Sequence, residues 1–497
     1  MNKKLKNSII ITGILLLSGW LIFSTINTVN YYNILGKVLK LVRSRYVETV
    51  PVDSLMKGAI KGVMEQLDPH SIYMSPREYK DLMINTEGEF GGLGIQISKI
   101  GNYITIVAPI EGTPAYRIGL QSGDKIVKIE GKSTLDMSLA EAVSKMRGKP
   151  GTKVTVTISR EGEEPFDVTI TREIIRIDAV PFFTTIDGIG YIRLSDFNKN
   201  AYSQTKKALN DLLNNKGVKG IVLDLRSNPG GLLDQAIELS SLFIDRGKVV
   251  VSTKGRNEYE EFKSRGNRFK KFPLIVLIDN GSASASEILS GSIQDWDRGL
   301  ILGTRSFGKG SVQRVYPLED GGAVKITIAL WLTPSGRRIS EYFARSDTAN
   351  TYKTLVFGRI EKGGGGIHPD TTVPYPKRNK LTQTLIIKNI FFQFAVHYMA
   401  IHKKTVRDIS DEMMKEFKKY IESKGIKYSK EDWVDSYKQN KYYLKMSLYE
   451  REWGTKGRYK ALLSEDNQVK TAINILKQCK NYKDVFKFAS KKAAAKN

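Results

Sequence analysis

Three serines alternate with alanines in the stretch DNGSASASE, which begins at Asp279. A serine hydroxyl can attack a carbonyl carbon when a neighbouring base takes its proton. No histidine lies near these serines in the sequence, but a lysine can serve as the base instead. Lys309 stands between Gly308 and Gly310, directly before an apolar strand, and glycine on both sides allows a tight turn. A serine–lysine pair for acyl transfer is therefore one hypothesis for this region.

Each of these features also has an interpretation without chemistry. Ser284 and Glu287 have the spacing of a capping box, which satisfies the first backbone N–H groups of a helix. Lys309 taken alone is typical of a solvated lysine in a hairpin. To accept a proton near neutral pH, its pKa would have to fall by about three units from ~10.4, and burial can lower a lysine pKa by ~3–5 units. The residues alone leave both interpretations open.

Two loops are expected at the same edge of a sheet. The stretch DLRSNPGG, Asp224 to Gly231, and the serine stretch each follow an apolar strand and precede a helix. In open α/β sheets, sites form at the carboxyl ends of the strands. The helix N-termini there carry unpaired N–H groups, which can stabilise a developing oxyanion. Gln313 lies four residues after Lys309, on the same face if both are in a strand, so its carbonyl oxygen could hold the lysine amine.

The wider pattern predicts several parts. Apolar residues at helical spacing run from Tyr31 to Met83, and Ser75 and Pro76 open a new short helix. From Gly88 the sequence alternates with period two around glycine turns, which predicts a β module of about 85 residues with two short helices. Strands and helices then alternate from about 175 to 376, which predicts a parallel or mixed sheet. The Lys-rich remainder is helical in pattern, and its stretch TQTLIIKNIFFQFAVHYMAIHKK is apolar nearly all round, which indicates burial.

The N-terminus predicts a membrane anchor. Ser8 to Ile26 carries no charge over nineteen residues and follows the basic stretch MNKKLKN, which is about the length needed to span a bilayer. A cleavable signal peptide is the alternative, but no clear small-x-small site follows. Positive-inside orientation keeps Lys3, Lys4 and Lys6 in the cytoplasm and the rest of the chain outside. The single cysteine, Cys479, excludes an intrachain disulfide and a cysteine-based metal site.

The net charge is +26, and the excess lies largely in the tail, where residues 371–497 carry 28 Lys and Arg against 13 Asp and Glu. Such a tail could bind nucleic acid, anionic lipid or an acidic polymer. Export argues against nucleic acid. The alternative is a set of solvated helical faces with no ligand.

Six stretches taken together resemble the carboxyl-terminal processing peptidases, also called tail-specific proteases. They are LDPHSIYMSP, GGLGI, VLDLRSNPGG, NGSASASEILSGSIQD, TRSFGKGSVQ and GGGGIHPD, and they run from about residue 30 to 375. Members of this family are Ser/Lys endopeptidases with a PDZ domain and a crotonase-like core. Carried over by position, the resemblance implies these roles: Ser284 as nucleophile, Lys309 as general base, Gln313 as the residue that orients the lysine, and the N–H groups of Ala285 and of Gly230 or Gly231 as oxyanion donors.

The stretch GGLGI matches the carboxylate-binding loop of PDZ domains. Its residues are Gly91, Gly92, Leu93, Gly94 and Ile95. Successive backbone N–H groups in such a loop form a nest for a terminal carboxylate, and the adjacent strand pairs with the bound peptide. Alone this signal is weak, but the stretch PAYRIGLQSGDKIVKIEG that follows strengthens it.

The expected fold is multidomain α+β. The expected parts are a cytoplasmic tip and transmembrane anchor (1–27), an N-terminal helical region (28–86), a PDZ domain (87–174), a crotonase-like α/β serine protease core (175–376) and a basic helical C-terminal extension (377–497). The resemblance assigns no role to the extension.

The resemblance implies a membrane-anchored serine endopeptidase that cleaves proteins near their C-termini through an acyl-enzyme, after PDZ capture of the C-terminus. It implies no metal and no cofactor. The expected partners are proteins or peptides with free C-termini and the membrane, with no nucleic acid, and a homo-oligomer is left open. The expected location is the bacterial cell envelope, as a single-pass inner-membrane protein with its bulk in the periplasm. Two alternatives stay open: a catalytically silent PDZ scaffold at the membrane, and a lipid- or polymer-binding protein that acts through its basic tail.

Overall fold

The computed structural model describes residues 30–266, 269, 271–340, 342–343, 350–402 and 406–489. The predicted membrane anchor, Ser8 to Ile26, lies outside these residues. The chain forms two compact units. One contains the chain up to Tyr79 together with Gln313–Thr327, and the other contains Lys80–Val312 and the chain from Ile328 onward.

The first unit combines the N-terminal helices with a hairpin from much later in the chain. A helix covers residues 30–45, and α2 (Val52–Glu65) and β1 (Ile72–Met74) follow. Strands β17 (Ser311–Pro317) and β18 (Ala323–Leu332) pair with each other, and β1 pairs antiparallel with β18, with Ile72 opposite Lys325. Helix α3 (Pro76–Glu87) begins as predicted, and the Glu78 carboxylate accepts hydrogen bonds from the N–H and hydroxyl of Ser75.

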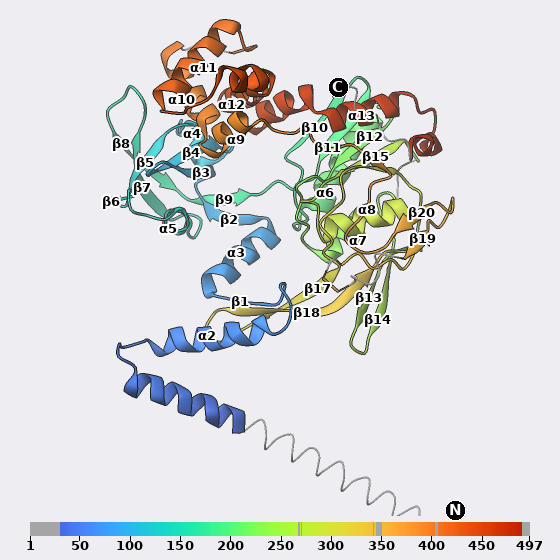
Figure 1. The fold of residues 1–497 in the computed structure, drawn as a ribbon, viewed down its shortest axis with the longest axis horizontal. Helices are drawn as coiled ribbons and strands as arrows, with labels where there is room; N and C mark the ends of the chain where they lie inside the picture. Colours follow the sequence, from blue (N-terminus) through green and yellow to red (C-terminus); the bar gives the residue numbers. More distant parts are fainter. Residues whose placement is uncertain are drawn as a thin grey trace, which may run out of the picture. The chain divides into compact units, whose positions relative to one another are not determined.

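The second unit begins with the predicted β module (Figure 1). Its sheet has the order β3-β4-β5-β7-β8 with β6 beside β5, and Ile104, Ile126 and Ile158 in its core are fully buried. The stretch PFDVTITRE forms β8, and the strand after it, β9, pairs with β2. The elements are β2 (Glu89–Gly92), β3 (Ile95–Ile100), β4 (Tyr103–Pro109), α4 (Pro114–Arg117), β5 (Lys125–Ile129), β6 (Lys132–Ser133), α5 (Leu139–Met146), β7 (Lys153–Ser159), β8 (Phe166–Thr171) and β9 (Glu173–Arg176).

A six-stranded mixed sheet forms the centre of the α/β part, as the strand–helix alternation predicted. Its order is β10-β11-β12-β15-β16-β21, and every pairing is parallel except that of β10 with β11. The strands are nearly all apolar because helices cover both faces. They are β10 (Phe182–Ile186), β11 (Ile189–Arg193), β12 (Ile221–Asp224), β15 (Leu274–Ile278), β16 (Leu300–Gly303) and β21 (Thr371–Thr372).

Different helices cover the two faces of this sheet (Figure 1). Helices α6 (Ala201–Asn210, continued as the π-helix η1, Asp211–Asn215), α7 (Leu233–Ser240) and α8 (Ala285–Asp295) share one apolar cluster with the sheet. Helix α13 (Asn467–Lys477) and η3 (Tyr482–Phe488) contribute to the cluster on the other face. Strands β13 (Val249–Gly255) and β14 (Tyr259–Lys263) pair beside the C-terminal half of β18, and β19 (Thr351–Lys353) pairs with β20 (Ile360–Lys362).

The predicted buried helix near residue 390 is two helices. Helices α9 (Lys380–Ile387) and α10 (Ile390–His402) are separated at Asn389, whose φ is 55°. They share an apolar cluster with α11 (Asp411–Ser423) and α12 (Lys430–Glu465). Among the described residues no single helix is both long and apolar enough to cross a membrane, and α9 with α10 meets that criterion only as a pair bent by 69°.

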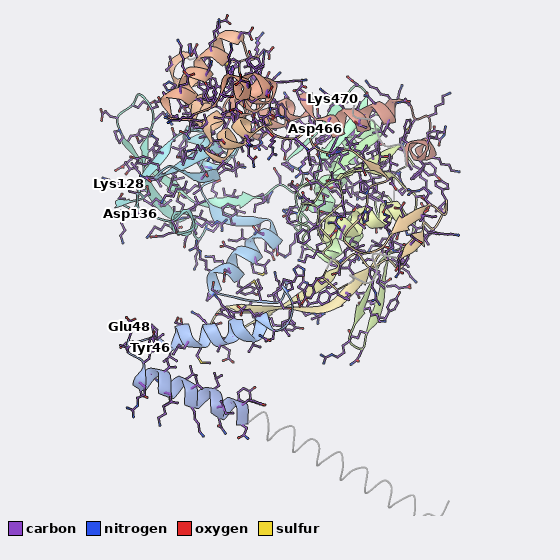
Figure 2. All side chains as sticks on the ribbon, viewed as in Figure 1. Tyr46, Glu48, Lys128, Asp136, Asp466 and Lys470 are labelled. Carbon is purple, nitrogen blue, oxygen red and sulfur yellow. The ribbon has the colours of Figure 1, made fainter. Side chains whose placement is uncertain are left out.

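Helix α13 joins the basic tail to the sheet, which the sequence did not predict. Its residues Val469, Ala472 and Leu476 are buried in the sheet's second apolar cluster. At its start, the Asp466 carboxylate accepts from Arg226 Nη1 at 2.8 Å, and Asp466 also caps the helix. Figure 2 shows Asp466 and Lys470 on this helix. The tail is therefore part of the core as well as a carrier of positive charge.

Replacing Asp466 with alanine is expected to destabilise the protein by about 2–4 kcal/mol, because a helix cap and one partner of a buried arginine are lost together. The midpoint of thermal unfolding of the purified protein measures this. Lys470→Ala is the matched control on the same helix, since Lys470 pairs with Glu465 across solvent and both side chains are 50% exposed; exposed pairs contribute little. Equal midpoints for the two variants would contradict the structural role of Asp466.

Candidate active site

The two loops predicted at one edge of the sheet lie side by side. Strands β12 and β15 are parallel neighbours, with Asp224 opposite Leu277, so the loops that follow them leave the sheet together. Backbone N–H of Ala283 donates to the carbonyl of Asn228 at 3.0 Å. Asp279 receives the N–H of Ser227 at 2.7 Å. The loop that carries the three serines (the serine loop) and the loop from Asp224 to Gly231 (the Gly-rich loop) therefore form one hydrogen-bonded structure.

The three alternating serines have different environments. The hydroxyl of Ser282 donates to the carbonyl of Leu225, and that of Ser286 donates to the carbonyl of Asn228, both at 2.9 Å. Both serines are fully buried, whereas Ser284 is partly exposed. The outer serines thus hold the neighbouring loop, and the middle one is presented at the start of α8.

Ser284 has a backbone conformation that few residues other than glycine adopt. Its φ is 54° and its ψ is −114°. Such a conformation costs on the order of 1–3 kcal/mol and persists only where surrounding contacts enforce it. Here those contacts come from both sides, since Ala283 is bonded to Asn228 and Ser286 to the same carbonyl.

Glu287 connects the serine loop to the segment that carries Lys309, called the lysine loop below. One carboxylate oxygen accepts from the N–H of Ser284 at 2.8 Å and the N–H of Lys309 at 2.9 Å. The other accepts from the Ser306 hydroxyl at 2.6 Å and the N–H of Gly308 at 2.7 Å. A single side chain therefore fixes both segments that carry the predicted nucleophile and base.

The charge of Glu287 is buried. The residue is fully buried, and this burial raises the pKa of its carboxyl, while the four donors oppose the shift. The capping box predicted from Ser284 and Glu287 is present. The cap and the catalytic hypothesis are therefore compatible, because the capping carboxylate also anchors the lysine loop.

Lys309 is partly buried and lies before β17. The expectation that it shares a strand face with Gln313 is wrong, because the strand begins only at Ser311 and Gly308 turns the chain with a φ of 93°. The backbone of Lys309 is fixed at both ends: its N–H donates to Glu287 and its carbonyl accepts from the Trp331 indole at 3.1 Å.

The predicted oxyanion donors lie at the start of α8 and in the Gly-rich loop. A Cβ added to Gly230 would come within 2.9 Å of both the Ala285 nitrogen and the Ser284 Cβ, so the two segments touch. The N–H of Gly230 donates to the side chain of Asn228 at 2.9 Å. Among the described residues, the N–H groups of Ala285 and Gly231 have no hydrogen-bond acceptor.

The other side of the Gly-rich loop rests on a buried ion cluster. Asp224 pairs with Arg226 and Arg193, and Arg226 reaches Asp466 and Gln468 of the tail. Burial opposes ionisation of Asp224, but the two guanidinium groups hold the pKa of its carboxyl far below the ordinary value. The C-terminal helix α13 thus supports the loop that carries Gly230 and Gly231.

The predicted carboxylate-binding loop joins β2 to β3. The carbonyl of Leu93 accepts from the N–H of Ala115, and that of Gly94 accepts from Ile110 and Thr113. Within the described part of the chain, the N–H groups of Leu93 and Gly94 have no acceptor. Strand β3 lies at the edge of its sheet and could pair with an added strand.

Gly94 must be glycine in this loop. Its φ is 78°, and an added Cβ would lie 2.2 Å from the Thr113 side chain. Gly91 and Gly92 belong to β2 and Ile95 begins β3, so only Leu93 and Gly94 form the turn itself.

The structure therefore brings together Ser284, Lys309, Ala285 and the Gly230–Gly231 segment through shared hydrogen bonds, whereas Gln313 belongs to the other compact unit. Sequence reasoning missed Asn228 and the reach of Glu287, because the capping-box spacing reveals only the local half of the Glu287 contacts. In the described ranges no group of three His, Cys, Asp or Glu side chains is placed to hold a metal ion.

Family models match four segments of the chain. They are the model of peptidase family S41 at residues 188–349, a PDZ domain at 105–160, the C-terminal helical domain of a probable PDZ-protease at 381–433, and the N-terminal domain of the activating protease CtpB at 25–77. The segments that carry the serine and lysine loops thus lie within the peptidase match.

Curated proteins similar to this chain are named as proteases too. A carboxy-terminal-processing protease of Bartonella bacilliformis is 46% identical over 312 residues, which cover 61% of this chain and 71% of the relative. The carboxy-terminal processing protease CtpA of Bacillus subtilis is 38% identical over 307 residues, 61% of this chain and 66% of the relative. Among solved structures, the photosystem II D1 C-terminal processing protease is 28% identical, with a TM-score of 0.39 over 67% of this chain and 86% of that chain.

A PDZ domain, a peptidase core and a helical C-terminal domain in one chain define a serine-type peptidase that carries its own peptide-binding domain. The chain belongs to the carboxy-terminal processing proteases of peptidase family S41.

Replacing Glu287 with glutamine is expected to lower proteolytic activity by about 100-fold or more, because in either orientation the amide NH₂ would face a backbone N–H donor, that of Gly308 in the less costly one, and lose its hydrogen bond to the lysine loop. Cleavage of fluorescein-labelled casein measures the activity, and circular dichroism checks the fold.

Glu238→Gln on α7 is the matched control, because Glu238 pairs with the exposed Arg265 and with no other charged group in the described ranges; the activity of this variant should stay within about twofold of the parent. Full activity of the Glu287→Gln variant would show that the carboxylate does not hold the site.

Proposed function

We propose that this peptidase works by a Ser/Lys mechanism. Lys309 accepts the proton of the Ser284 hydroxyl, and the serine oxygen attacks the carbonyl carbon of the scissile peptide. As the tetrahedral intermediate collapses, the C–N bond breaks and Lys309 returns the proton to the leaving amine. Water then hydrolyses the ester, with Lys309 again as the base, and the acid product leaves.

The observation that carries this proposal is the shared carboxylate of Glu287. It receives the N–H groups of both Ser284 and Lys309, at 2.8 and 2.9 Å. The partial exposure of Ser284 beside two buried serines supports the same choice of nucleophile. Gln313 is proposed to accept a hydrogen bond from the Lys309 amine and so to orient it.

For the oxyanion, the proposed donors are the N–H groups of Ala285 and Gly231. Both lack an acceptor among the described residues, whereas the N–H of Gly230 is held by Asn228. Gly230 then contributes by having no side chain, since a Cβ there would crowd the Ala285 nitrogen. Backbone donors preset in this way stabilise the charge that develops in the transition state.

We propose that the PDZ domain captures the substrate's C-terminus. The unpaired N–H groups of Leu93 and Gly94, with the edge strand β3 beside them, support this role for the loop from Gly91 to Ile95. The proposed substrates are therefore proteins and peptides with a free C-terminal carboxylate, cleaved near that end. Family membership favours this function over the silent scaffold and over a protein that acts only through its basic tail.

Four further proposals concern setting and architecture. The uncharged stretch from Ser8 to Ile26 supports a membrane anchor, and positive-inside orientation then puts the bulk of the chain in the periplasm of a bacterial cell envelope. A crotonase-like core is supported by parallel strands whose following loops carry the site. A homo-oligomer stays a prediction, and its interface would be sought at the exposed apolar side chains of residues 30–45.

Ser284→Ala and Lys309→Ala are each expected to abolish casein cleavage and labelling by a fluorophosphonate, which reacts with activated serines. Ser282→Ala keeps the nucleophile and is expected to retain cleavage, with a lower unfolding midpoint because a buried hydroxyl is lost. Loss of labelling in Ser282→Ala together with its retention in Ser284→Ala would overturn the assignment.

The pH dependence of labelling tests the base separately. Protonated Lys309 cannot accept a proton, so the rate should fall as pH decreases, with a midpoint well below ~10.4. A rate that rises only near pH ~10 would indicate an unperturbed lysine and would exclude this base.

Amidation of a peptide's C-terminus is expected to weaken its binding about 10- to 100-fold, since hydrogen bonds to a charged group contribute roughly 1.5–3 kcal/mol each. Acetylation of the N-terminus of the same peptide is the control and should leave affinity unchanged. Titration of the three fluorescent peptides measures binding, and equal affinities would remove carboxylate capture from the proposal.

A further inference from the structure

The motif LDPHS, Leu67 to Ser71, has no role in the function proposed above. It lies in the smaller compact unit, between α2 and β1. The Asp68 carboxylate accepts the N–H of His70 at 2.9 Å and the N–H and hydroxyl of Ser71 at 3.1 and 2.7 Å. Locally, Asp68 therefore closes the turn that starts β1.

Asp68 also binds a residue that lies 259 positions later. The Thr327 hydroxyl donates to Asp68 at 3.1 Å, and the Thr327 N–H donates to the Ser71 hydroxyl at 3.1 Å. Thr327 is in β18, which pairs with both β1 and β17. The turn is thus fastened to the central strand of this unit.

The network continues to Gln313. The side-chain nitrogen of Gln313 donates to the Thr327 hydroxyl oxygen at 3.1 Å, from β17 to β18. Asp68, Thr327 and Gln313 therefore form one chain of hydrogen bonds, and all three residues belong to the same compact unit.

The direction of these bonds follows from the number of protons. An ionised carboxylate can only accept, and a threonine hydroxyl has a single proton to give. Burial opposes ionisation of Asp68, but the hydrogen bonds from Ser71, His70 and Thr327 lower the pKa of its carboxyl below the ordinary value. Thr327 must then give its proton to Asp68 and can only accept from Gln313.

We propose that Asp68 and Thr327 are positioning residues that fix the orientation of the Gln313 amide, with its nitrogen toward Thr327 and its oxygen kept as the acceptor for the catalytic lysine. This inference rests on the proposed function, which gives Gln313 the role of holding the Lys309 amine. Asp68 lies in the turn between α2, which ends at Glu65, and β1, so the N-terminal helical region supplies one of the two positioning residues.

A purely structural network would serve only to fasten the turn. A positioning role and a purely structural role of Thr327 differ in whether the effect of its substitution on rate depends on Gln313. If Thr327 acts through Gln313, then loss of the hydroxyl has no further effect once Gln313 has been removed. If Thr327 acts only on stability, the effects of the two substitutions on rate are independent and multiply.

The test measures the rate of fluorophosphonate labelling of the full-length protein, which depends on the nucleophile and not on substrate capture. We expect Gln313→Ala and Thr327→Val each to slow labelling about tenfold, with the same shift of the pH–rate midpoint. The double variant is expected to be no slower than Gln313→Ala. Thr327→Ser, which keeps the hydroxyl, should restore the rate to within about threefold of the parent.

Asp68→Ala is the second variant, in case Thr327→Val folds poorly. Alanine removes the acceptor of the Thr327 proton, which frees that proton for the oxygen of Gln313 and lets the Gln313 amide reverse. We expect this variant to slow labelling as much as Gln313→Ala does. Combining it with Gln313→Ala is expected to slow labelling no further.

Tyr73→Phe is the matched control in the same unit. It removes a hydroxyl that donates to Asp320 at 2.6 Å, outside the chain that leads to Gln313, and labelling should be unchanged. Parent-like labelling in Thr327→Val and Asp68→Ala, with Gln313→Ala slow, would overturn this inference and leave the proposed function standing. Parent-like labelling in Gln313→Ala would instead overturn the role of Gln313, and this inference with it.

Discussion

The site depends on one buried carboxylate. Glu287 gathers four donors, two from the lysine loop backbone, one from the serine loop and one from the Ser306 hydroxyl. A buried charge is costly unless every lone pair is satisfied, and satisfied networks of this kind are rigid. Because the donors come from segments some twenty residues apart in the chain, the same bonds that solvate Glu287 also set the position of Lys309 relative to Ser284.

A second support lies on the opposite side of the Gly-rich loop. Arg226 joins Asp224 at the end of β12 to Asp466 at the start of α13, so the tail stabilises the loop beside the serine. Among the tail helices, α13 packs against the sheet, and α12 contacts β4 of the PDZ domain. The described helices of the tail bury apolar side chains in the sheet's second apolar cluster and in the cluster that α9 to α12 share.

The proposed catalytic groups fall into both compact units. Ser284 and Lys309 belong to the larger one, and Gln313 begins the segment that belongs to the smaller one. Within the smaller unit, Asp68, Thr327 and Gln313 form one chain of hydrogen bonds, which is the basis of the positioning role proposed above.

The sequence by itself determined the family, the α/β alternation, the β module and the loops that carry Ser284, Lys309 and the PDZ glycines, because these depend on local spacing and on hydrophobic periodicity. It predicted the capping box of Ser284 and Glu287 as well, since a cap is a contact between near neighbours. Only the tertiary structure decided that the Glu287 carboxylate also accepts hydrogen bonds from the segment between Ser306 and Lys309. It likewise decided that the Asn228 side chain accepts the N–H of Gly230, and that Thr327 links Asp68 to Gln313. These are contacts between strands and loops far apart in the chain, and side-chain spacing contains no information about which distant donors a buried acceptor will meet.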